Sequence, residues 1–394
     1  MSEPAKTRPL LWIVTPYIGE PSEIWIIRQI LGMTAFDIEV LCWRDVREPG
    51  QLPDLPVHLL EDPLPSRRNE EGLAKWAGRL VRAPGRNFLA ANRGETGQIA
   101  ALAARRKPDV MLCHFGQTAL RVRPVAARLG VPQVVHFHGV DLSSSLRNRW
   151  YRWSLMTVLP QFDQIVTVGS RQQSWLTDHA IASDRIARIP CGAPIGEFAR
   201  QRPMPEGPPK YVTVSRLMPQ KGVDINIRAF AEIAKEIPDA RLTVIGDGRD
   251  RDKLPALAHN LGVADQVRFA GILPPSEVRR ELEEATVFLQ HSLDYKGWYE
   301  GFGVSLTEAM AMEMPVIVSD CGGLVDQVSD GETGLVCPQG DVGAVADAMR
   351  KLAADPDLAH TLGQAARHSA RGNFDTAGQV AKLQAVLLDQ VRSN

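Results

Sequence analysis

A pair of glycines stands directly before a run of helix-forming residues in the segment Glu300–Met312, EGFGVSLTEAMAM. Gly301 and Gly303 leave the backbone open at the start of the expected helix, where free N–H groups and the positive end of the helix dipole attract a phosphate. Glu308 lies about one turn into that helix, where its carboxylate would accept hydrogen bonds from the vicinal hydroxyl groups of a ribose. Glu300 precedes the glycines, at the position that a sugar beyond the phosphates would occupy. The alternative is a tight turn before an ordinary helix whose first-turn carboxylate satisfies the dipole.

A basic loop, SRLMPQKG, follows an expected strand at 211–215. Arg216 and Lys221, five residues later, would hold a diphosphate from the side opposite the glycines, because a guanidinium fork and an ammonium group both bind phosphate oxygens. Cationic side chains at a departing diphosphate also stabilise the transition state for its departure. The alternative is a solvated surface loop, which is the commoner setting for such residues.

Short apolar, β-branched runs alternate with longer helical stretches, which is the pattern of parallel sheets built from β-α-β units. The expected strands are 10–16, 37–43, 109–115, 132–138 and 163–169, and then 211–215, 241–246, 267–271, 287–291 and 315–319. Helical stretches such as 22–31 and 95–106 separate several of them. We therefore predict an α/β fold with two doubly wound parallel-sheet domains.

The segment 199–209, ARQRPMPEGPP, has a composition that continues neither a helix nor a central strand. It is the expected linker between a first domain, 1–198, and a second domain, 210–375. A last helix, within 376–394, has apolar residues on one face and is expected to pack against another element, with the first domain as the candidate. Doubly wound sheets bind ligands outside the carboxyl ends of their strands, so two such domains facing each other would form a cleft.

The composition excludes several classes of protein. With 44% hydrophobic and 23% charged residues the chain can bury full-sized cores. A formal net charge of -1 argues against a nucleic-acid binder, although residues 1–200 carry a small excess of Lys and Arg that suits a phosphate or a lipid surface. The five cysteines lie far apart without a CxxC spacing, so neither a zinc site nor a disulfide framework is indicated. No stretch suits a signal peptide or a membrane span, and we expect a cytoplasmic protein.

Several motifs follow one another in order through the second half of the chain. They are SRLxxxKG at 215–222, GDG at 246–248, Glu300-x7-Glu308 with GFG inside it, EAMAxxxPVIVSDCGG at 308–323 and DGETGLV at 330–336. Together they resemble the retaining glycosyltransferases of family 4. The resemblance implies the GT-B fold, in which two Rossmann-like domains face a central cleft and the second domain holds most of a nucleotide sugar.

The resemblance also implies roles for the matching residues. Glu308 holds the ribose, Arg216 and Lys221 neutralise the diphosphate, and Glu300 orients the sugar hydroxyls. The implied donor-binding residues are Arg216, Lys221, Gly246, Leu273, Gly301, Phe302, Gly303, Val304 and Glu308. The implied catalytic residues are His138, Arg216, Lys221 and Glu300.

The first half resembles exopolysaccharide-type members of the same family through HFG at 114–116 and HFHGVD at 136–141. His136 and His138 alternate at strand spacing and so point to one face. His138, the last residue before the glycine, corresponds to a family position that contacts the transferred sugar; a structural histidine at a strand end is the alternative. The expected acceptor-side residues are His114 and, in a loop at 15–23 similar to one that closes over the diphosphate, Gly19 and Glu23, although the family often has two glycines there.

Two features depart from the family or suggest a metal. After Gly322 and Gly323 the family usually shows Pro-Glu, whereas this chain has Val325 and Asp326, which retains a carboxylate. The sequence Asp250-Arg-Asp252 spells a DxD motif, which holds a metal in the other large glycosyltransferase fold. Here it opens an expected surface helix, where acidic residues are favoured anyway. We interpret it as structural and expect no metal and no cofactor.

The segment 143–156, SSSLRNRWYRWSLM, mixes three arginines with two tryptophans and a tyrosine. Such a helix could lie on an anionic membrane surface, where a lipid-linked acceptor would be found. A buried helix with a basic rim is the alternative. The expected location is therefore cytoplasmic, with a peripheral contact at the inner membrane face left open.

These features predict a retaining, metal-independent glycosyltransferase that moves a sugar from a nucleoside-diphosphate sugar to a saccharide or lipid-linked saccharide, in polysaccharide or glycoconjugate biosynthesis. A GT-B-fold nucleotide-sugar epimerase and a non-catalytic GT-B partner subunit are the alternatives. A dinucleotide oxidoreductase is disfavoured, because the glycine segments at 246–248 and 301–303 lack the third glycine of GxGxxG. The sequence leaves the base, the sugar and the acceptor open, and no nucleic-acid partner is expected.

Overall fold

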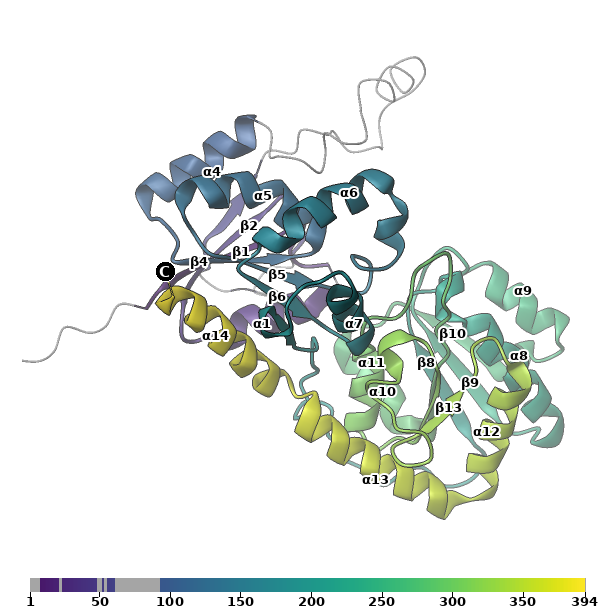
Figure 1. Ribbon diagram of the computed structural model, residues 1–394. Helices are drawn as coiled ribbons and strands as arrows, with labels where there is room; N and C mark the ends of the chain where they lie inside the picture. The colour runs from purple at the N-terminus through teal and green to yellow at the C-terminus, as the bar shows by residue number, and fades with distance from the viewer. Residues whose placement is uncertain (1–7, 21–22, 48–51, 53–54, 61–92, 394) are drawn as a thin grey trace, which may run out of the picture. The chain divides into compact units, whose positions relative to one another are not determined.

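The computed structural model describes residues 8–20, 23–47, 52, 55–60 and 93–393 of the chain (Figure 1). The described residues form two compact units. Unit 1 comprises residues up to Val168, Gln172–Ile189 and Gln379 onward; unit 2 comprises Gly169–Arg171 and Pro190–Gly378. Each unit is built on one parallel β-sheet, as the alternation of apolar and helical stretches predicts, and the predicted fold class is confirmed.

In the described part of the chain, the unit 1 sheet has seven parallel strands in the order β3-β2-β1-β4-β5-β6-β7. They are β1 (Leu10–Thr15), β2 (Asp37–Cys42), β3 (Val57–Leu59), β4 (Val110–His114), β5 (Gln133–Phe137), β6 (Gln164–Thr167) and β7 (Ile186–Arg188). The helices are α1 (Ile24–Gly32), α4 (Arg93–Arg105), α5 (Gly116–Leu129), α6 (Arg149–Val158) and α7 (Ser170–Asp178). Figure 1 shows α4, α5 and α6 over one face of this sheet. The central strands β4 and β5 are buried at every residue, because both faces of the sheet are covered.

The unit 2 sheet has six parallel strands among the described residues, in the order β10-β9-β8-β11-β12-β13. They are β8 (Lys210–Val214), β9 (Arg241–Ile245), β10 (Val267–Gly271), β11 (Val287–Gln290), β12 (Val316–Ser319) and β13 (Leu335–Cys337). One hydrophobic core packs α8 (Val223–Glu236), α9 (Lys253–Asn260) and α12 (Val342–Ala354) against the sheet. A second core packs α10 (Pro275–Glu284), α11 (Val304–Ala311) and α13 (Pro356–Asn373) against the sheet. The sheet is therefore doubly wound.

The boundary between the units lies at Ile189 and Pro190, earlier than the end at residue 198 expected from the sequence. The physical reason is that Ile195 and Phe198 are buried in a core of unit 2. The expected linker 199–209 also begins inside unit 2, since Arg200 donates hydrogen bonds to backbone carbonyls there, including that of Met312 at 2.9 Å. The proline-rich segment therefore lies within unit 2, directly before β8. The boundary between the units lies about ten residues earlier in the chain.

The last helix, α14 (Thr376–Arg392), crosses from one unit to the other. Its residues from Gln379 onward belong to unit 1, where Leu383 and Leu387 are fully buried. The side chain of Gln384 accepts a hydrogen bond of 2.8 Å from the backbone N–H of Ala35, just after α1. The apolar face of this helix is therefore covered by the first unit.

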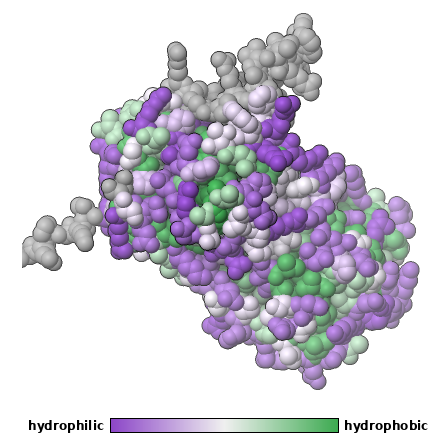
Figure 2. All heavy atoms as spheres, viewed as in Figure 1, coloured by the Kyte–Doolittle hydropathy of each residue, from purple (hydrophilic) through white to green (hydrophobic). Residues whose placement is uncertain are grey.

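The surface seen in Figure 2 is mostly hydrophilic, with small hydrophobic patches. None of the helices in the described ranges combines the length and the apolar character that a membrane span requires.

Candidate functional site

The glycine pair of the sequence lies at the start of α11, as expected. Gly303 precedes the helix, and its N–H donates a 2.7 Å hydrogen bond to the Oε1 atom of Gln327. The Nε2 atom of Gln327 donates in turn to the carbonyl of Gly303 and to Oγ1 of Thr307, at 2.9 and 2.7 Å. A helix leaves the N–H groups of its first turn without partners inside the helix, so α11 presents donors at a fixed backbone. This arrangement suits an anion such as a phosphate.

Glu308 lies one turn into α11 and is only 9% exposed. The helix that carries it is tied to the sheet, because the hydroxyl of Ser305 donates a 2.9 Å hydrogen bond to the carbonyl of Val214, at the end of β8. A glutamate in this position is held on a rigid element near the carboxyl ends of the strands, which is where doubly wound sheets bind ligands.

Glu300 and Lys221 come from two separate motifs and form a buried ion pair. The ammonium of Lys221 lies 2.5 Å from Oε2 of Glu300, and the two side chains are 12% and 7% exposed. The same oxygen accepts hydrogen bonds from the hydroxyl of Ser292 at 2.8 Å and from Nε2 of Gln290 at 3.3 Å. Lys221 also lies over the ring of Trp298, 5.0 Å from its centre. The carboxylate is therefore fixed by three donors, and it neutralises the lysine.

A second glycine pair closes over the backbone of Glu300. Gly322 has a positive φ of 54°, and a Cβ there would lie 2.2 Å from the carbonyl oxygen of Glu300. A Cβ on Gly323 would lie 2.0 Å from the carbonyl oxygen of Gly301, and the N–H of Gly323 donates a 2.7 Å hydrogen bond to the carbonyl of Glu300. Only glycine allows this approach. The loop that departs from the family at Val325 is thus held at its glycine end against the Glu300 segment, with Val325 itself exposed.

The basic loop after β8 rests on the GDG segment. A Cβ on Gly246, whose φ is positive, would lie 1.9 Å from the carbonyl oxygen of Ser215. The N–H of Leu217 donates a 2.9 Å hydrogen bond to the carbonyl of Asp247. Arg216, between these anchors, is exposed, and its side chain makes no hydrogen bond or ion pair with the residues that the structure describes. Its guanidinium group is therefore available to an anion.

Three further residues of the implied donor set, Leu273, Phe302 and Val304, lie in unit 2. Leu273, two residues after β10, is half-buried and packs against a hydrophobic core of unit 2. The ring of Phe302 lies 5.7 Å from that of Phe374. Val304 is the first residue of α11.

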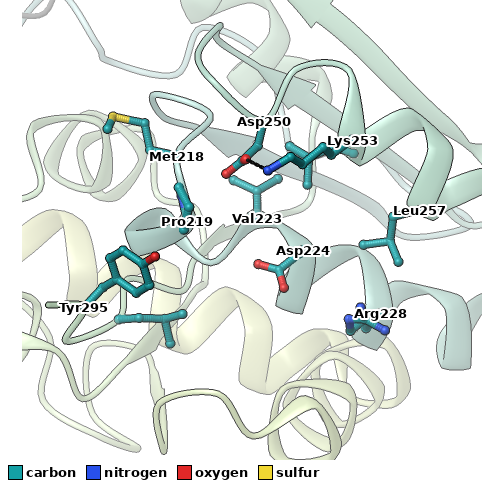
Figure 3. A pocket seen from close by; sticks show the side chains of 11 residues that line it. Met218, Pro219, Val223, Asp224, Arg228, Asp250, Lys253, Leu257 and Tyr295 are labelled. Atoms are coloured by element: carbon teal, nitrogen blue, oxygen red, sulfur yellow. Dashed lines mark hydrogen bonds and ion pairs between the residues drawn. The ribbon is translucent and has the colours of Figure 1, made fainter.

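The DxD sequence lies just before α9. Asp250 is 8% exposed and pairs with Lys253 at 3.1 Å. The two residues line a pocket of about 460 Å³, whose lining also includes Pro219 and Tyr295. Figure 3 shows the pair among these side chains. The backbone N–H of Asp250 also donates a 3.0 Å hydrogen bond to the carbonyl of Leu217. These contacts fit the structural interpretation of the motif.

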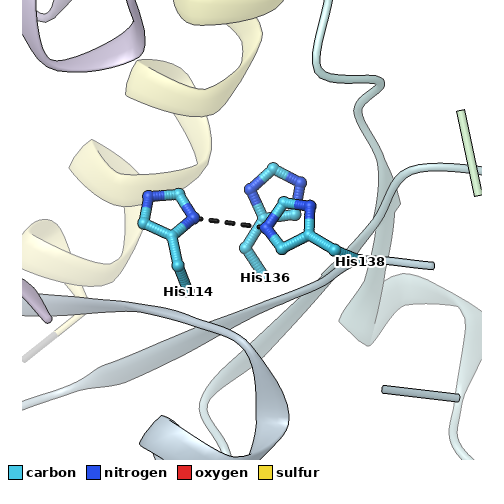
Figure 4. Close-up of side chains that lie close together, drawn as sticks. All are labelled: His114, His136 and His138. Carbon is cyan, nitrogen blue, oxygen red and sulfur yellow. Dashed lines mark hydrogen bonds between the residues drawn. The ribbon is translucent and has the colours of Figure 1, made fainter. Parts of the chain in front are cut away.

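In unit 1, the ends of β4 and β5 bring three histidines together (Figure 4). His114 and His136 are fully buried, and His138 is 6% exposed. The Nδ1 atom of His114 lies 3.3 Å from Nε2 of His138. His136 and His138 are on the same side, as strand alternation predicts, with ring centres 4.3 Å apart. Burial lowers the pKa of all three imidazoles, that of His136 to about 3, so they are neutral at physiological pH.

Asp141 fixes the backbone next to His138, and it is absent from the site residues proposed from the sequence. Its carboxylate accepts hydrogen bonds from the N–H of His138 at 2.8 Å and from the N–H of Gly116 at 3.1 Å. Burial raises the pKa of Asp141 to about 7, and these two donors act in the opposite direction. A Cβ on Gly116, the first residue of α5, would lie 2.3 Å from the hydroxyl of Tyr151, so a larger residue there would displace this buried side chain. Asp141 is the last residue of the HG-x-D motif, so the motif could have identified it as a candidate site residue.

The amino-terminal loop follows β1. Gly19 has a φ of 96°, and a Cβ there would lie 2.5 Å from the backbone of Arg47. The positive φ and the close backbone approach both require glycine at this position of the loop. Glu23 accepts a 2.8 Å hydrogen bond from the hydroxyl of Tyr17. The ring of Trp25, at the start of α1, lies 4.2 Å from that of His138 and covers the histidine cluster. The loop residues 21 and 22 lie outside the described residues.

Comparisons with known proteins agree with this architecture. Residues 195–369 match the family model described as glycosyl transferases group 1, and residues 54–196 match the model described as glycosyltransferase family 4. The crystal structure of HepE from Anabaena in complex with UDP has a TM-score of 0.76 and 17% sequence identity, and covers 97% of this chain and 100% of that chain. At that identity the likeness shows the GT-B fold alone.

Two relatives in sequence are glycosyltransferases by name. The amylovoran biosynthesis glycosyltransferase AmsK of Erwinia amylovora is 28% identical, over 64% of each chain. The GDP-mannose-dependent alpha-(1-6)-phosphatidylinositol monomannoside mannosyltransferase of Mycolicibacterium smegmatis is 31% identical over 71% of this chain and 76% of its own length. With the family models matched in both halves, these relatives show that the chain belongs to the family 4 glycosyltransferases.

Proposed function

We propose that this glycosyltransferase moves a sugar, with retention of its anomeric configuration, from a nucleoside-diphosphate sugar to a hydroxyl group of a saccharide or lipid-linked saccharide. The observation that carries the proposal is the group in unit 2 formed by the Lys221–Glu300 ion pair, the exposed Arg216 and the start of α11. Two names support the donor class: the M. smegmatis relative is GDP-mannose-dependent, and the HepE structure holds UDP.

Each part of this group has a role toward the donor. Arg216 and Lys221 bind the diphosphate and neutralise the charge that develops as it leaves. The first-turn N–H groups of α11 bind a phosphate oxygen. Glu308 accepts hydrogen bonds from the ribose hydroxyls, and Glu300 from the sugar hydroxyls.

The binding of Glu300 to three donors bears on the mechanism. The ion pair with Lys221 and the hydrogen bonds from Ser292 and Gln290 all use the Oε2 atom of Glu300, so they lower the nucleophilicity of the carboxylate and leave Oε1 to accept hydrogen bonds from the sugar hydroxyls. We therefore favour attack on the same face of the sugar. The acceptor oxygen bonds to the anomeric carbon as the bond from that carbon to the diphosphate breaks, and the acceptor proton passes to a diphosphate oxygen. Cationic side chains supply the charge stabilisation, so we expect the transfer to require no metal.

On the acceptor side, we assign His138 to contact with the transferred sugar, and His114, Gly19 and Glu23 to support of the acceptor loop. His138 is suited to sugar recognition because it is the most exposed of the three clustered histidines and is neutral. A neutral imidazole can both donate and accept a hydrogen bond with a sugar hydroxyl.

The test combines donor binding with product formation. Thermal stability is measured with UDP-, GDP- and ADP-sugars, in EDTA and in magnesium. A ligand at a hundred times its Kd stabilises the protein by about 2.7 kcal/mol. We expect one nucleotide class to stabilise the protein equally in both buffers, and Arg216→Ala to abolish the effect. Arg280→Ala, which changes another exposed arginine in unit 2, is the control. Loss of stabilisation in EDTA, or none with any nucleotide sugar, contradicts the donor site.

Product analysis separates the alternatives. Incubation of the cognate donor with candidate acceptors should give a glycoside whose anomeric configuration, read by NMR, equals that of the donor. An epimerase would instead convert the donor without any acceptor. A non-catalytic subunit would bind the donor and change nothing.

We infer in addition that α6 contacts an anionic membrane surface. The helix is anchored by the buried Tyr151 and Leu155, while Trp150 and Trp153 are 40% and 55% exposed. The arginines on this segment are exposed too; they are Arg147, Arg149 and Arg152. Exposed tryptophans beside arginines favour an interfacial helix over a buried helix with a basic rim.

Sedimentation with vesicles tests this contact. We expect binding to vesicles containing phosphatidylglycerol, weaker binding to pure phosphatidylcholine, and loss of binding in the double variant Trp150→Ala/Trp153→Ala. The control is Ile272→Ala, which removes an exposed apolar residue from unit 2. Equal binding by the double variant and the control contradicts the assignment.

A further inference from the structure

The three histidines at the ends of β4 and β5 form a compact set of possible metal ligands. One ring nitrogen from each of His114, His136 and His138 lies within 4.8 Å of the others. Figure 4 shows the three rings grouped above the strands, with the His114–His138 contact marked. The rings come from neighbouring strands, whose register places His114 beside His136. The cluster is therefore built on the rigid centre of the unit 1 sheet.

Several ring nitrogens of the cluster have no hydrogen-bond partner among the described residues. Nε2 of His114 and both ring nitrogens of His136 are buried and make no hydrogen bond with the described residues. The backbone of Ile189 acts to raise the pKa of His136, against the larger, lowering effect of burial. A buried polar nitrogen without a partner is costly, and native structures rarely keep several in one place without a function.

The spacing of the rings fits a tetrahedral metal. Imidazole nitrogens bind Zn²⁺ at about 2.0–2.1 Å, which places two such ligands about 3.3–3.4 Å apart. The Nδ1 atom of His114 and Nε2 of His138 are already 3.3 Å apart. The ligand atom of His136 lies no farther than 4.8 Å from the other two, so this ring has to approach them by at most about 1.5 Å to complete a three-nitrogen set.

The chemistry of the rings is equally suitable. Imidazole is a preferred ligand of Zn²⁺, Co²⁺, Ni²⁺ and Cu²⁺. All three side chains are buried, and a neutral imidazole carries one ring nitrogen with a free lone pair that can bind a metal. Asp141, which accepts the backbone N–H of His138, places a carboxyl group near the cluster that can offset part of the added positive charge.

We propose that His114, His136 and His138 bind one divalent transition-metal ion of the Zn²⁺ type, and that its binding inhibits the transferase. The inhibition rests on the proposed function, because His138 cannot bind the metal and the transferred sugar through the same nitrogen. The site differs from the DxD sequence before α9, which we interpret as structural, and no metal is invoked for the donor diphosphate. It is a regulatory site, in which the metal competes with substrate.

Direct binding is measured first, on the full untagged chain. Equilibrium dialysis against Zn²⁺ with elemental analysis should give one tightly bound ion per chain. His136→Gln, which changes a ligand without a proposed catalytic role, should weaken this binding at least tenfold. His259→Gln, on the surface of unit 2, should leave it unchanged. Absence of stoichiometric Zn²⁺ in the wild type, or equal binding by His136→Gln, overturns the site.

Two further readouts keep the test independent of the folding of the variant. Circular dichroism establishes whether His136→Gln is folded. Co²⁺ added to the wild type should produce the intense visible absorption bands of a four-coordinate ion, and Zn²⁺ should remove them. Only the weak bands of hydrated Co²⁺ would contradict the three-histidine site.

The inhibition is measured with the cognate nucleotide sugar and acceptor. Zn²⁺ at a concentration that saturates the dialysis site should reduce transfer by at least tenfold, EDTA should restore it, and His136→Gln should resist the inhibition. Full activity of the Zn²⁺-loaded wild type overturns the inhibitory role. If no nucleotide sugar supports transfer at all, the proposed function fails, whereas the dialysis and Co²⁺ results still decide the metal site.

Discussion

The ammonium of Lys221 and the carboxylate of Glu300 lie 2.5 Å apart, although 79 residues separate them in the sequence. The sequence assigned them to different partners, the diphosphate and the sugar. In the structure each is the other's counter-charge, and Glu300 is additionally held by Ser292 and Gln290. In the proposed function, an arriving diphosphate shares the lysine with Glu300, so the pair couples binding of the phosphates to the position of the sugar-binding carboxylate.

The pair should be energetically coupled. Breaking a buried pair by removing one partner leaves an uncompensated charge and costs about 3–5 kcal/mol. Lys221→Met and Glu300→Gln should each destabilise unit 2 by about that amount. The double variant should lose clearly less than the sum, because neither charge is then left alone. Urea denaturation of the four proteins measures this. Strict additivity would show that the two side chains do not depend on each other.

The glycine that closes over Glu300 allows a second, matched comparison. Gly322→Ala combines a positive φ with a Cβ 2.2 Å from the carbonyl oxygen of Glu300. Gly331→Ala has a similar positive φ of 72° but open space around the Cβ. The left-handed backbone costs about 1–2 kcal/mol in both. We expect Gly322→Ala to lose at least about 1 kcal/mol more than Gly331→Ala in thermal or urea unfolding. Equal losses of stability in the two variants would mean that the close approach to Glu300 does not contribute to the stability of unit 2.

His291 predicts an acid-dependent loss of stability in unit 2. Its Nε2 accepts a 2.8 Å hydrogen bond from the N–H of Gly340, so the folded state holds the neutral ring. Burial lowers its pKa to about 4, against the raising effects of Asp320 and Asp341. The unfolded chain, with a histidine pKa of about 6.5, binds more protons between these values. The contribution is therefore complete above about pH 6.5 and is lost as the pH falls toward 4, by at most about 3 kcal/mol.

His291→Gln isolates this contribution, since the amide oxygen can accept the same N–H but does not titrate. The variant should resemble the wild type at pH 7.5 and should lose less stability by pH 4.5. Urea denaturation at four or five pH values gives both curves. Parallel curves would show that His291 is not the group responsible.

The longer strands of both sheets could be predicted because short apolar, β-branched runs of four to six residues are visible in the local sequence. Every strand predicted from the sequence is present within one or two residues of its expected ends. The strands that were not predicted, β3, β7 and β13, are three residues long, too short to show an alternation. Their strand geometry comes from pairing with a neighbour in the sheet.

Residues of the candidate site could be proposed from the sequence where motifs repeat a family pattern, and not where single polar residues make contacts far along the chain. Glu300, Lys221 and His138 lie in recognisable segments. Gln327, which fixes the start of α11, and Ser292, which binds Glu300, are ordinary residues whose roles depend on the fold. The burial of Ile195 and Phe198 likewise depends on tertiary packing, which is why the proline-rich segment misplaced the boundary between the units.

The two carboxylate oxygens of Asp141 accept hydrogen bonds from two different backbone N–H groups, so both oxygens should be needed for stability. Oδ2 accepts the N–H of His138 and Oδ1 accepts that of Gly116, in a side chain that is almost fully buried. In Asp141→Asn one oxygen becomes an NH₂ group, which faces an N–H donor and leaves it unsatisfied. A buried donor without a partner costs about 1–3 kcal/mol. We expect unit 1 to be destabilised by that amount, and His138, whose backbone is then less restrained, to support slower transfer.

The matched control is Asp163→Asn in the same unit. The exposed Asp163 accepts a single backbone N–H, from Gln133 at 2.7 Å, through one oxygen. An asparagine keeps that oxygen and turns its NH₂ group to water, so the change should cost a few tenths of a kcal/mol on the scale of surface substitutions. Urea unfolding of both variants measures the difference. If Asp163→Asn is as destabilising as Asp141→Asn, the loss of stability comes from the removal of a negative charge in general. If Asp141→Asn alone is destabilised, the second backbone donor is the cause, and the turn that carries His138 depends on both oxygens.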